Sequence, residues 1–223
     1  MNKIIAMIPA RMGSQRLKQK NLRELGGIPL ITRAIRKCKE AGVFDEIWVN
    51  SENAAFGEIA QAEGVGFHQR PAVLGSNQAT SEQFVREFLD HHECDFVFQV
   101  HSIAPLLTVA EIKGFVVEMK RECHDSLLSY EPIQIECALE GRPLNFAFNE
   151  KTNSQELKPV QRIAWSISGW RRSSFLAAVA AGQCATYAGR VGFTPVSHLA
   201  AHVIKTEEDL WLAGALLASE GKG

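Results

Sequence analysis

The sequence predicts an α/β fold, with a mostly parallel, doubly wound sheet as its centre. Two observations carry this prediction. Short apolar runs of strand length alternate with helical apolar stripes from residue 3 to residue 122. The first run, residues 3–10 (KIIAMIPA), is continuously apolar, as expected for a central parallel strand that is buried on both faces.

The predicted elements follow one another in β-α order. We expect strands at residues 3–10, 44–51, 66–71 and 95–102, and helices at 29–43, 52–65, 80–93 and 108–122. The helix at 29–43 has an apolar stripe and is closed by Gly42. Thr80 or Ser81 is the expected N-cap of its helix, with Glu82 or Gln83 in support, and Thr108 caps the last of the four.

The pattern changes between residues 126 and 165. Strand-like sequence at 126–134 and 144–151 is joined by turn-rich sequence, with no helix between the two. We interpret this segment as a β-rich excursion used for contact in a homodimer. A helix at 173–183, a strand leading through 187–196 and a helix at 206–219 complete a single domain over residues 1–223.

Composition excludes several classes of protein. The net charge of −1 argues against a nucleic-acid-binding protein, which needs a basic face. No run approaches the roughly 18 apolar residues that span a membrane, and the N-terminus does not resemble a signal peptide. The five cysteines are scattered without C-x-x-C spacing, which predicts reduced thiols in a cytoplasmic protein rather than disulfides or a zinc site.

The segment after the first strand is locally cationic. Arg11, Arg16, Lys18 and Lys20 lie within ten residues, around a Gly13-Ser14 pair. Small residues let backbone N–H groups approach phosphate oxygens, and arginine offers two parallel donors to the same group. Because ligands of open α/β sheets bind at the carboxyl ends of strands, we expect a phosphate-binding loop here. The alternative is a solvated basic loop, since the segment matches neither the P-loop nor the G-x-G-x-x-G pattern.

The order of residues in this segment indicates a particular protein family, which its charge alone does not. Residues 8–31 (IPARMGSQRLKQKNLRELGGIPLI) resemble the N-terminal signature of the sugar-acid cytidylyltransferases, which act on sialic, Kdo, pseudaminic and legionaminic acids. Three later segments are similar to the family in the same order, at residues 69–85 (QRPAVLGSNQATSEQFV), 95–108 (DFVFQVHSIAPLLT) and 206–213 (TEEDLWLA). The resemblance is weakest between about residues 130 and 165.

The resemblance implies a Rossmann-like nucleotide-diphospho-sugar transferase fold and transfer of CMP from CTP to a 2-keto sugar acid, with release of pyrophosphate. It places the triphosphate and ribose against the first loop, at Ala10, Arg11, Gly13, Ser14, Lys20 and Asn21. It brings the cytosine and ribose near Arg70, Ala79, Thr80 and Ser81. For Thr80 and Ser81 helix capping is an equal explanation, and Arg70 is alternatively a surface cation before a proline.

Two departures from the family pattern bear on mechanism. His101 stands where these enzymes carry a glutamine that binds the sugar. Val203 and Lys205 stand where the family has two aspartates that ligate Mg²⁺, so the expected metal lacks its usual ligands. Either Lys205 acts as a fixed cation in place of the metal, together with Arg11 and Lys20, or the chain binds nucleotide or sugar without turnover.

Arginines are candidates for the sugar carboxylate, which invites a bidentate guanidinium. Arg162, before the apolar run IAWSI, is the stronger candidate. The pair Arg171–Arg172 is better explained as a solvated helix start. A transferase of the same fold with another nucleotide or acceptor is a further possibility, because fold alone does not choose a substrate.

Overall fold

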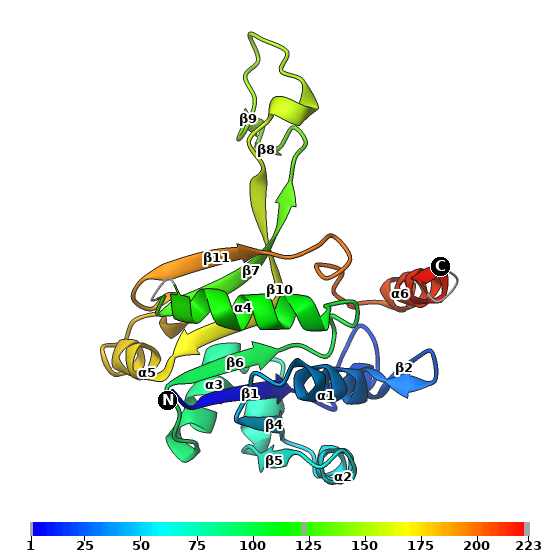
Figure 1. Cartoon of the computed structure of the whole chain (residues 1–223), viewed down its shortest axis with the longest axis vertical. Coiled ribbons are helices and arrows are strands. Elements are labelled where there is room, and N and C mark those ends of the chain that lie inside the picture. Colours follow the sequence, from blue (N-terminus) through cyan, green and yellow to red (C-terminus); the bar gives the residue numbers. More distant parts are fainter. Residues whose placement is uncertain (1, 122–123, 221–223) are drawn as a thin grey trace.

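A seven-stranded mixed sheet forms the centre of the molecule, with strand order β11-β7-β10-β6-β1-β4-β5 (Figure 1). The structure is a computed structural model that describes residues 2–121 and 124–220. Strand β10 runs antiparallel to both β6 and β7, and the other neighbouring pairs are parallel. The predicted mostly parallel α/β sheet is therefore confirmed.

The strands of the main sheet are β1 (Ile4–Pro9), β4 (Glu46–Ser51), β5 (Gly66–Gln69), β6 (Phe96–Val100), β7 (Ser126–Ile133), β10 (Val160–Arg171) and β11 (Val191–Pro195). Two small hairpins pair β2 (Glu24–Leu25) with β3 (Ile28–Pro29), and β8 (Ala138–Leu139) with β9 (Arg142–Pro143). The helices are α1 (Leu30–Ala41), α2 (Ala55–Ala62), α3 (Ser81–His91), α4 (Val109–Arg121), α5 (Arg172–Ala180) and α6 (Glu207–Glu220).

Helices cover both faces of the sheet, as a doubly wound fold requires. Side chains of α1, α2 and α4 pack with those of β1 and β6 in one core cluster, which includes Ile31, Phe56 and Ile112. Side chains of α3 and α5, among them Phe88 and Phe175, form a second cluster with the opposite face of the same strands. Strand β1 contributes to both clusters, which explains why residues 3–10 are apolar at nearly every position.

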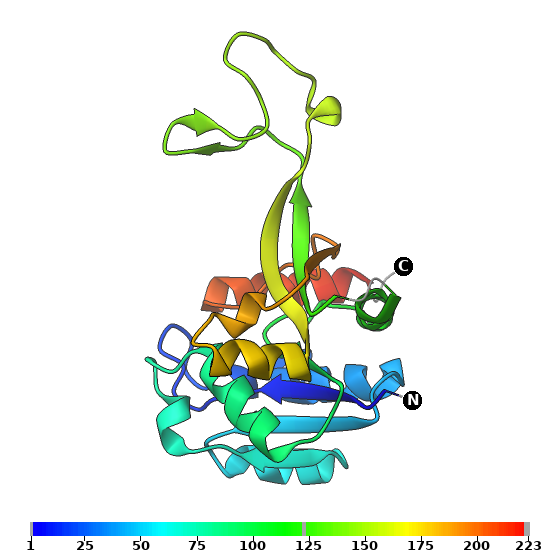
Figure 2. The same cartoon turned by 90° about the vertical axis from the view of Figure 1, so that its left-hand side faces the viewer.

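The segment 126–165 contains a long two-stranded arm that projects away from the sheet (Figures 1 and 2). The predicted excursion needs two corrections. Its two ends belong to strands of the main sheet, because Leu128 and Tyr130 of β7 pair with Ser168 and Ile163 of β10. The predicted strand at 144–151 is wrong: that stretch forms turns and bends, and the side-chain amide of Asn145 donates to the backbone carbonyl groups of Ile135 and Lys158.

The arm leaves the sheet where the pairing of β10 with β7 changes register, between Ile163 and Ser168. Trp165 lies within this irregularity with a φ of 56°, a backbone conformation that side chains with a Cβ rarely adopt. Extra residues in one strand bend it and increase its twist. The register shift therefore redirects β10 from the sheet into the arm.

The carboxyl ends of the parallel strands meet at one edge of the sheet. Pro9, the last residue of β1, is in register with Asn50 near the end of β4, and Met7 is in register with Gln99 of β6. The loops that follow these three strands consequently emerge side by side. Within residues 2–121 and 124–220, no helix has both the length and the apolar character needed to cross a bilayer.

Candidate functional site

A cleft of about 300 Å³ opens where the segments that follow β1, β5 and β6 meet. The loop after β1 provides one wall, the segment from residue 70 to residue 84 a second, and the residues that follow β6 the third. The lining residues are Pro9, Ala10, Arg11, Ser14, Lys20, Asn21, Arg70, Leu74, Ser76, Asn77, Ala79, Phe84, His101, Ser102 and Ile103. Ligand sites of doubly wound folds lie in this position relative to the sheet.

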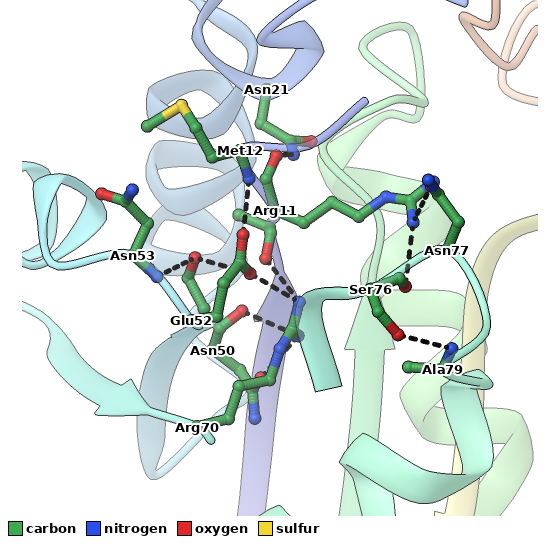
Figure 3. A network of polar contacts seen from close by, with 12 residues as sticks. Arg11, Met12, Asn21, Asn50, Glu52, Asn53, Arg70, Ser76, Asn77 and Ala79 are labelled. Atoms are coloured by element: carbon green, nitrogen blue, oxygen red, sulfur yellow. Dashed lines mark hydrogen bonds and ion pairs between the residues drawn. The ribbon is translucent and has the colours of Figure 1, made fainter. Parts of the chain in front are cut away.

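Arg70 is the structural centre of one wall (Figure 3). Its side chain is buried, and its guanidinium donates to Asn50 Oδ1 at 2.7 Å, to the Ala10 carbonyl at 2.8 Å and to Glu52 Oε2 at 3.2 Å. The guanidinium also lies 4.7 Å from the ring centre of Phe84. Arg70 thus ties the ends of β1 and β4 to α3, and is not the surface cation that was one alternative from the sequence.

Hydrogen bonds of Arg11 and Asn21 connect the loop after β1 to the two other walls of the cleft. Asn21 donates to the Arg11 carbonyl at 3.1 Å and accepts from Ser102 Oγ at 2.8 Å, which connects the loop to the residues after β6. The Arg11 side chain reaches across the cleft and donates to Asn77 Oδ1 at 3.1 Å and to the Ser76 carbonyl at 3.3 Å (Figure 3). Both acceptors are uncharged and both bonds lie at the surface. An anionic ligand can therefore replace them as the partner of the Arg11 guanidinium.

A second, polar hollow of about 170 Å³ adjoins the cleft. It is lined by Arg11, Ser14, Gln15, Arg16, Leu17, Lys20, Asn77 and Lys205. Four of these residues are cationic, and they come from both ends of the chain. The sequence predicted the cluster of the first loop, and the family resemblance predicted Lys205 as a further cation beside it; the hollow contains both.

Lys20 lies between the cleft and this hollow. Its Nζ donates to the Ile204 carbonyl at 3.0 Å. Burial, and then the neighbouring charges of Arg16, Arg11 and Lys205, lower the pKa of Lys20 to about 8. A bound anion would relieve this repulsion, because an opposite charge favours the ammonium form. The charges around Lys20 therefore favour the binding of an anion.

His101 lies at the end of β6, against the same cleft. Its Nε2 is 3.1 Å from the Gln99 side-chain oxygen, and the two side chains form a hydrogen bond. Burial, reinforced by the charge of Lys20, lowers the pKa of His101 to about 4. The imidazole is therefore neutral at physiological pH.

Most of the residues predicted for the site come together. Ala10, Arg11, Ser14, Lys20, Asn21, Arg70, Ala79 and His101 line the cleft, and Lys205 lines the hollow beside it. Gly13 lies in the same loop, with open space around the position a Cβ would occupy. Ser76, Asn77 and Phe84 line the cleft but were not predicted as site residues, although they lie within residues 69–85, whose sequence resembles the family.

Five other residues that were considered as candidates lie outside both linings. Thr80 caps α3 in a full capping box with Gln83, and Ser81 is the first residue of that helix. Arg162 lies on β10 and forms an ion pair with Glu131 of β7, at the base of the arm. Arg171 and Arg172 bind Asp125 and Glu93 respectively, which agrees with their interpretation as residues of a helix start.

The residues near Lys205 do not fit a divalent metal. Val203 packs against the main core cluster. The Asp209 carboxylate already accepts from the backbone N–H groups of Lys205 and Thr206, both at 2.8 Å. Among the described residues that line the cleft and the hollow, none carries a carboxylate. Mg²⁺ prefers oxygen ligands, usually with one or two carboxylates, so a protein-bound magnesium ion has no ligand set here.

The sequence matches a protein-family model described as cytidylyltransferase over residues 5–181. This chain is a member of the cytidylyltransferase family. The match spans β1 through α5 and so includes the cleft. Family membership confirms the resemblance that the opening loop indicated.

Curated relatives of this cytidylyltransferase-family chain are N-acylneuraminate cytidylyltransferases. The sequence is 30% identical over 127 residues to form A from Danio rerio, covering 56% of this chain and 30% of that protein. It is 30% identical over 135 residues to the enzyme of Streptococcus agalactiae serotype III, covering 59% of this chain and 33% of that protein. The aligned part thus spans about a third of these relatives.

Solved structures show the same fold over nearly the whole chain. A CMP:2-keto-3-deoxy-manno-octonic acid synthetase complexed with CTP aligns with a TM-score of 0.71 and 17% identity, covering 98% of this chain and 99% of that one. The 2-C-methyl-D-erythritol 4-phosphate cytidylyltransferase of Thermus thermophilus aligns with a TM-score of 0.63 and 15% identity, covering 96% and 98%. These likenesses establish the nucleotide-diphospho-sugar transferase fold.

Proposed function

We propose that this protein transfers CMP from CTP to the anomeric hydroxyl of a 2-keto sugar acid of the sialic or nonulosonic type. The observation that carries the proposal is the convergence of Arg11, Lys20 and Lys205 beside a cleft at the carboxyl ends of the strands. The nature of the relatives supports the choice of nucleotide and acceptor. The curated relatives are named for N-acylneuraminate, and the structural relative that carries CTP is named for a keto sugar acid.

In this reaction the anomeric oxygen attacks the α-phosphorus of CTP. A bond forms between that oxygen and phosphorus, the bond from phosphorus to the bridging oxygen breaks, and pyrophosphate leaves with the bonding pair. The hydroxyl proton passes to solvent. Negative charge accumulates on the leaving group, so fixed cations near it stabilise the transition state more than the ground state. Arg11, Lys20 and Lys205 supply that charge.

The remaining residues of the site bind and orient. Arg70 holds the wall against which the nucleoside lies, through its bonds to Ala10 and Asn50. His101 is a poor general base, since a pKa of about 4 leaves it weakly basic. Its neutral ring instead forms a hydrogen bond with a sugar hydroxyl. Arg162 remains a prediction for the sugar carboxylate and would need a rearrangement away from Glu131 to reach it.

The missing carboxylates suggest that the protein supplies positive charge through Lys205 where its relatives are expected to use Mg²⁺. A magnesium ion that arrives already bound to CTP is compatible with this arrangement. A magnesium ion held by Val203 and Lys205 is not.

The test is pyrophosphate release from each of the four nucleoside triphosphates with a panel of 2-keto sugar acids. The assay runs with Mg²⁺ and, separately, with EDTA. Release that requires CTP and one of the sugar acids is the expected result. Absence of release in every combination, with CTP binding retained, would instead establish a second candidate function, that of a binding protein without turnover. The loss of the two metal-binding aspartates favours this alternative. Absence of both activities contradicts the assignment of the cleft.

A further inference from the structure

A cluster of metal-ligating side chains lies outside the cleft, between β5 and α3. His68 comes from β5, and Glu87 and His91 lie four residues apart on one face of α3. One ligand atom from each of the three lies within 4.8 Å of the others. None of the three lines the cleft or the cationic hollow.

The ring of His68 is fixed in orientation by its surroundings. Its Nε2 lies 2.8 Å from Glu87 Oε2, and its Nδ1 lies 3.0 Å from Nε2 of His92. His92 is itself held, because it stacks on Phe88 with ring centres 4.1 Å apart. Metal-binding histidines typically use one ring nitrogen for the metal and the other for such an orienting hydrogen bond.

We propose that His68, Glu87 and His91 form a binding site for a divalent transition metal of the zinc type. Two imidazole nitrogens and one carboxylate oxygen are a donor set that zinc accepts, with three protein ligands and an open fourth position. The His68 and Glu87 side chains are 10% and 19% exposed and so are held in place, whereas His91 is 60% exposed. The site is thus closed towards the core and open to solvent on the side of His91.

The close approach of His68 Nε2 to the carboxylate supports this assignment. A lone pair facing a carboxylate oxygen at 2.8 Å would be repulsive, so a proton must lie between the two atoms in the free protein. A metal ion takes the place of that proton between Nε2 and the carboxylate, and the neutral His68 ring then carries its hydrogen on Nδ1, towards Nε2 of His92. His91 then completes the site by a rotation of its exposed side chain.

Metal binding at this position links β5 to the C-terminal turn of α3. Arg70 follows His68 by two residues, and Phe84 lies one turn before Glu87 on α3, so both elements continue into a wall of the cleft. The proposal does not depend on the substrate of the cleft. We expect the metal to stabilise the contact between β5 and α3 whatever the reaction.

The experiment uses the full chain without an affinity tag, stripped of metal by a chelator. Zn²⁺ is titrated by calorimetry, and Co²⁺ is titrated by visible absorption as a geometric probe. We expect one metal ion per chain, a Co²⁺ spectrum without the intense bands of a thiolate ligand, and a higher Tm with Zn²⁺. The variants His91→Ala and Glu87→Gln should each weaken metal binding at least about tenfold. Replacing a residue that only orients a metal ligand already has an effect of this size, and these variants change the ligands themselves.

The control is His198→Ala, which removes an exposed histidine at a distant position on the chain and should leave the affinity unchanged. Circular dichroism of each variant checks that it is folded, and Glu87→Gln keeps a side-chain oxygen that His68 can use. Equal affinity in wild type, His91→Ala and Glu87→Gln would overturn the proposal. So would a thiolate-type Co²⁺ spectrum, or titrations that never saturate.

Discussion

Lys20 is a charged side chain in a position that disfavours its charge. Burial and the neighbouring cations lower the pKa of Lys20 to about 8, so the free protein loses this charge within an accessible pH range. The unfolded chain keeps its proton up to the usual lysine value of 10.5. Between these two values the unfolded state binds more protons, so the Lys20 contribution makes folding more favourable as pH rises.

Triphosphate binding should show the opposite dependence. A charge-assisted bond contributes about 1.5–3 kcal/mol, so CTP affinity should fall about tenfold or more as pH rises through the Lys20 pKa. Calorimetric titrations of CTP at a series of pH values measure this change. The variant Lys20→Met should bind more weakly and show a flatter profile. An identical pH slope in both proteins would assign the titration to another group.

Lys205 should act as a cation of the phosphate site. We expect Lys205→Ala to weaken CTP binding about tenfold, because one charge-assisted contact is lost. We also expect wild-type turnover that persists in EDTA and is abolished or greatly reduced in this variant. Lys18→Ala is the matched control, since Lys18 is an exposed cation of the first loop that lines neither the cleft nor the hollow. A Lys205→Ala protein with unchanged kinetics would remove the fixed-cation hypothesis.

Arg70 should be important for stability as well as for the cleft. Lysine in its place keeps the charge but loses the fork that reaches Asn50, Ala10 and Glu52 together. Arg70→Lys is therefore expected to lower the free energy of unfolding by about 2–4 kcal/mol, measured by urea denaturation. The exposed Arg86→Lys, which alters only a surface pair with Asp90, should change it by less than about 1 kcal/mol. Equal effects would show that the buried network is not stabilising.

At the scale of elements, two helices offer a matched pair of caps. Thr80 and Gln83 cap α3, and Thr108 and Glu111 form the equivalent bonds ahead of α4. Both Thr→Ala variants should lose about 1 kcal/mol of stability, measured by denaturation. Only Thr80→Ala should also weaken nucleotide binding, because Ala79 beside it lines the cleft. Similar CTP affinity in both variants would leave Thr80 with a capping role alone.

At the scale of the whole molecule, the arm carries apolar side chains that a single chain leaves exposed. Ile135, Leu139, Leu144 and Phe148 are 62%, 63%, 55% and 78% exposed. Exposed apolar groups of this size often mark an interaction surface. We expect a homodimer in light scattering, with Ile135→Asp and Phe148→Glu shifting the mass towards that of one chain. Trp211→Glu, at a comparably exposed site on α6, is the control. A monomeric wild type would contradict the dimer prediction.

The sequence by itself determined the alternation of strands and helices, the caps at Thr80 and Thr108, and the family signature in the loop after the first strand. These features are local, since apolar periodicity, capping chemistry and a contiguous motif are all read within a few neighbouring residues. The segment 144–151 marks the limit of such reading. Its composition suits a strand, but the stretch forms turns and bends in the arm. There the side-chain amide of Asn145 donates to backbone carbonyl groups that are distant in the sequence.

Only the tertiary structure decided what surrounds each charged group. It buries Arg70 against Glu52, places Lys205 in the same hollow as Lys20, which only the family resemblance had indicated, and pairs Arg162 with Glu131. It also places His68 next to Glu87 and His91. The physical reason is common to all four cases: the pKa, the partner and the accessibility of a charged side chain depend on distances across the fold, which no local pattern contains.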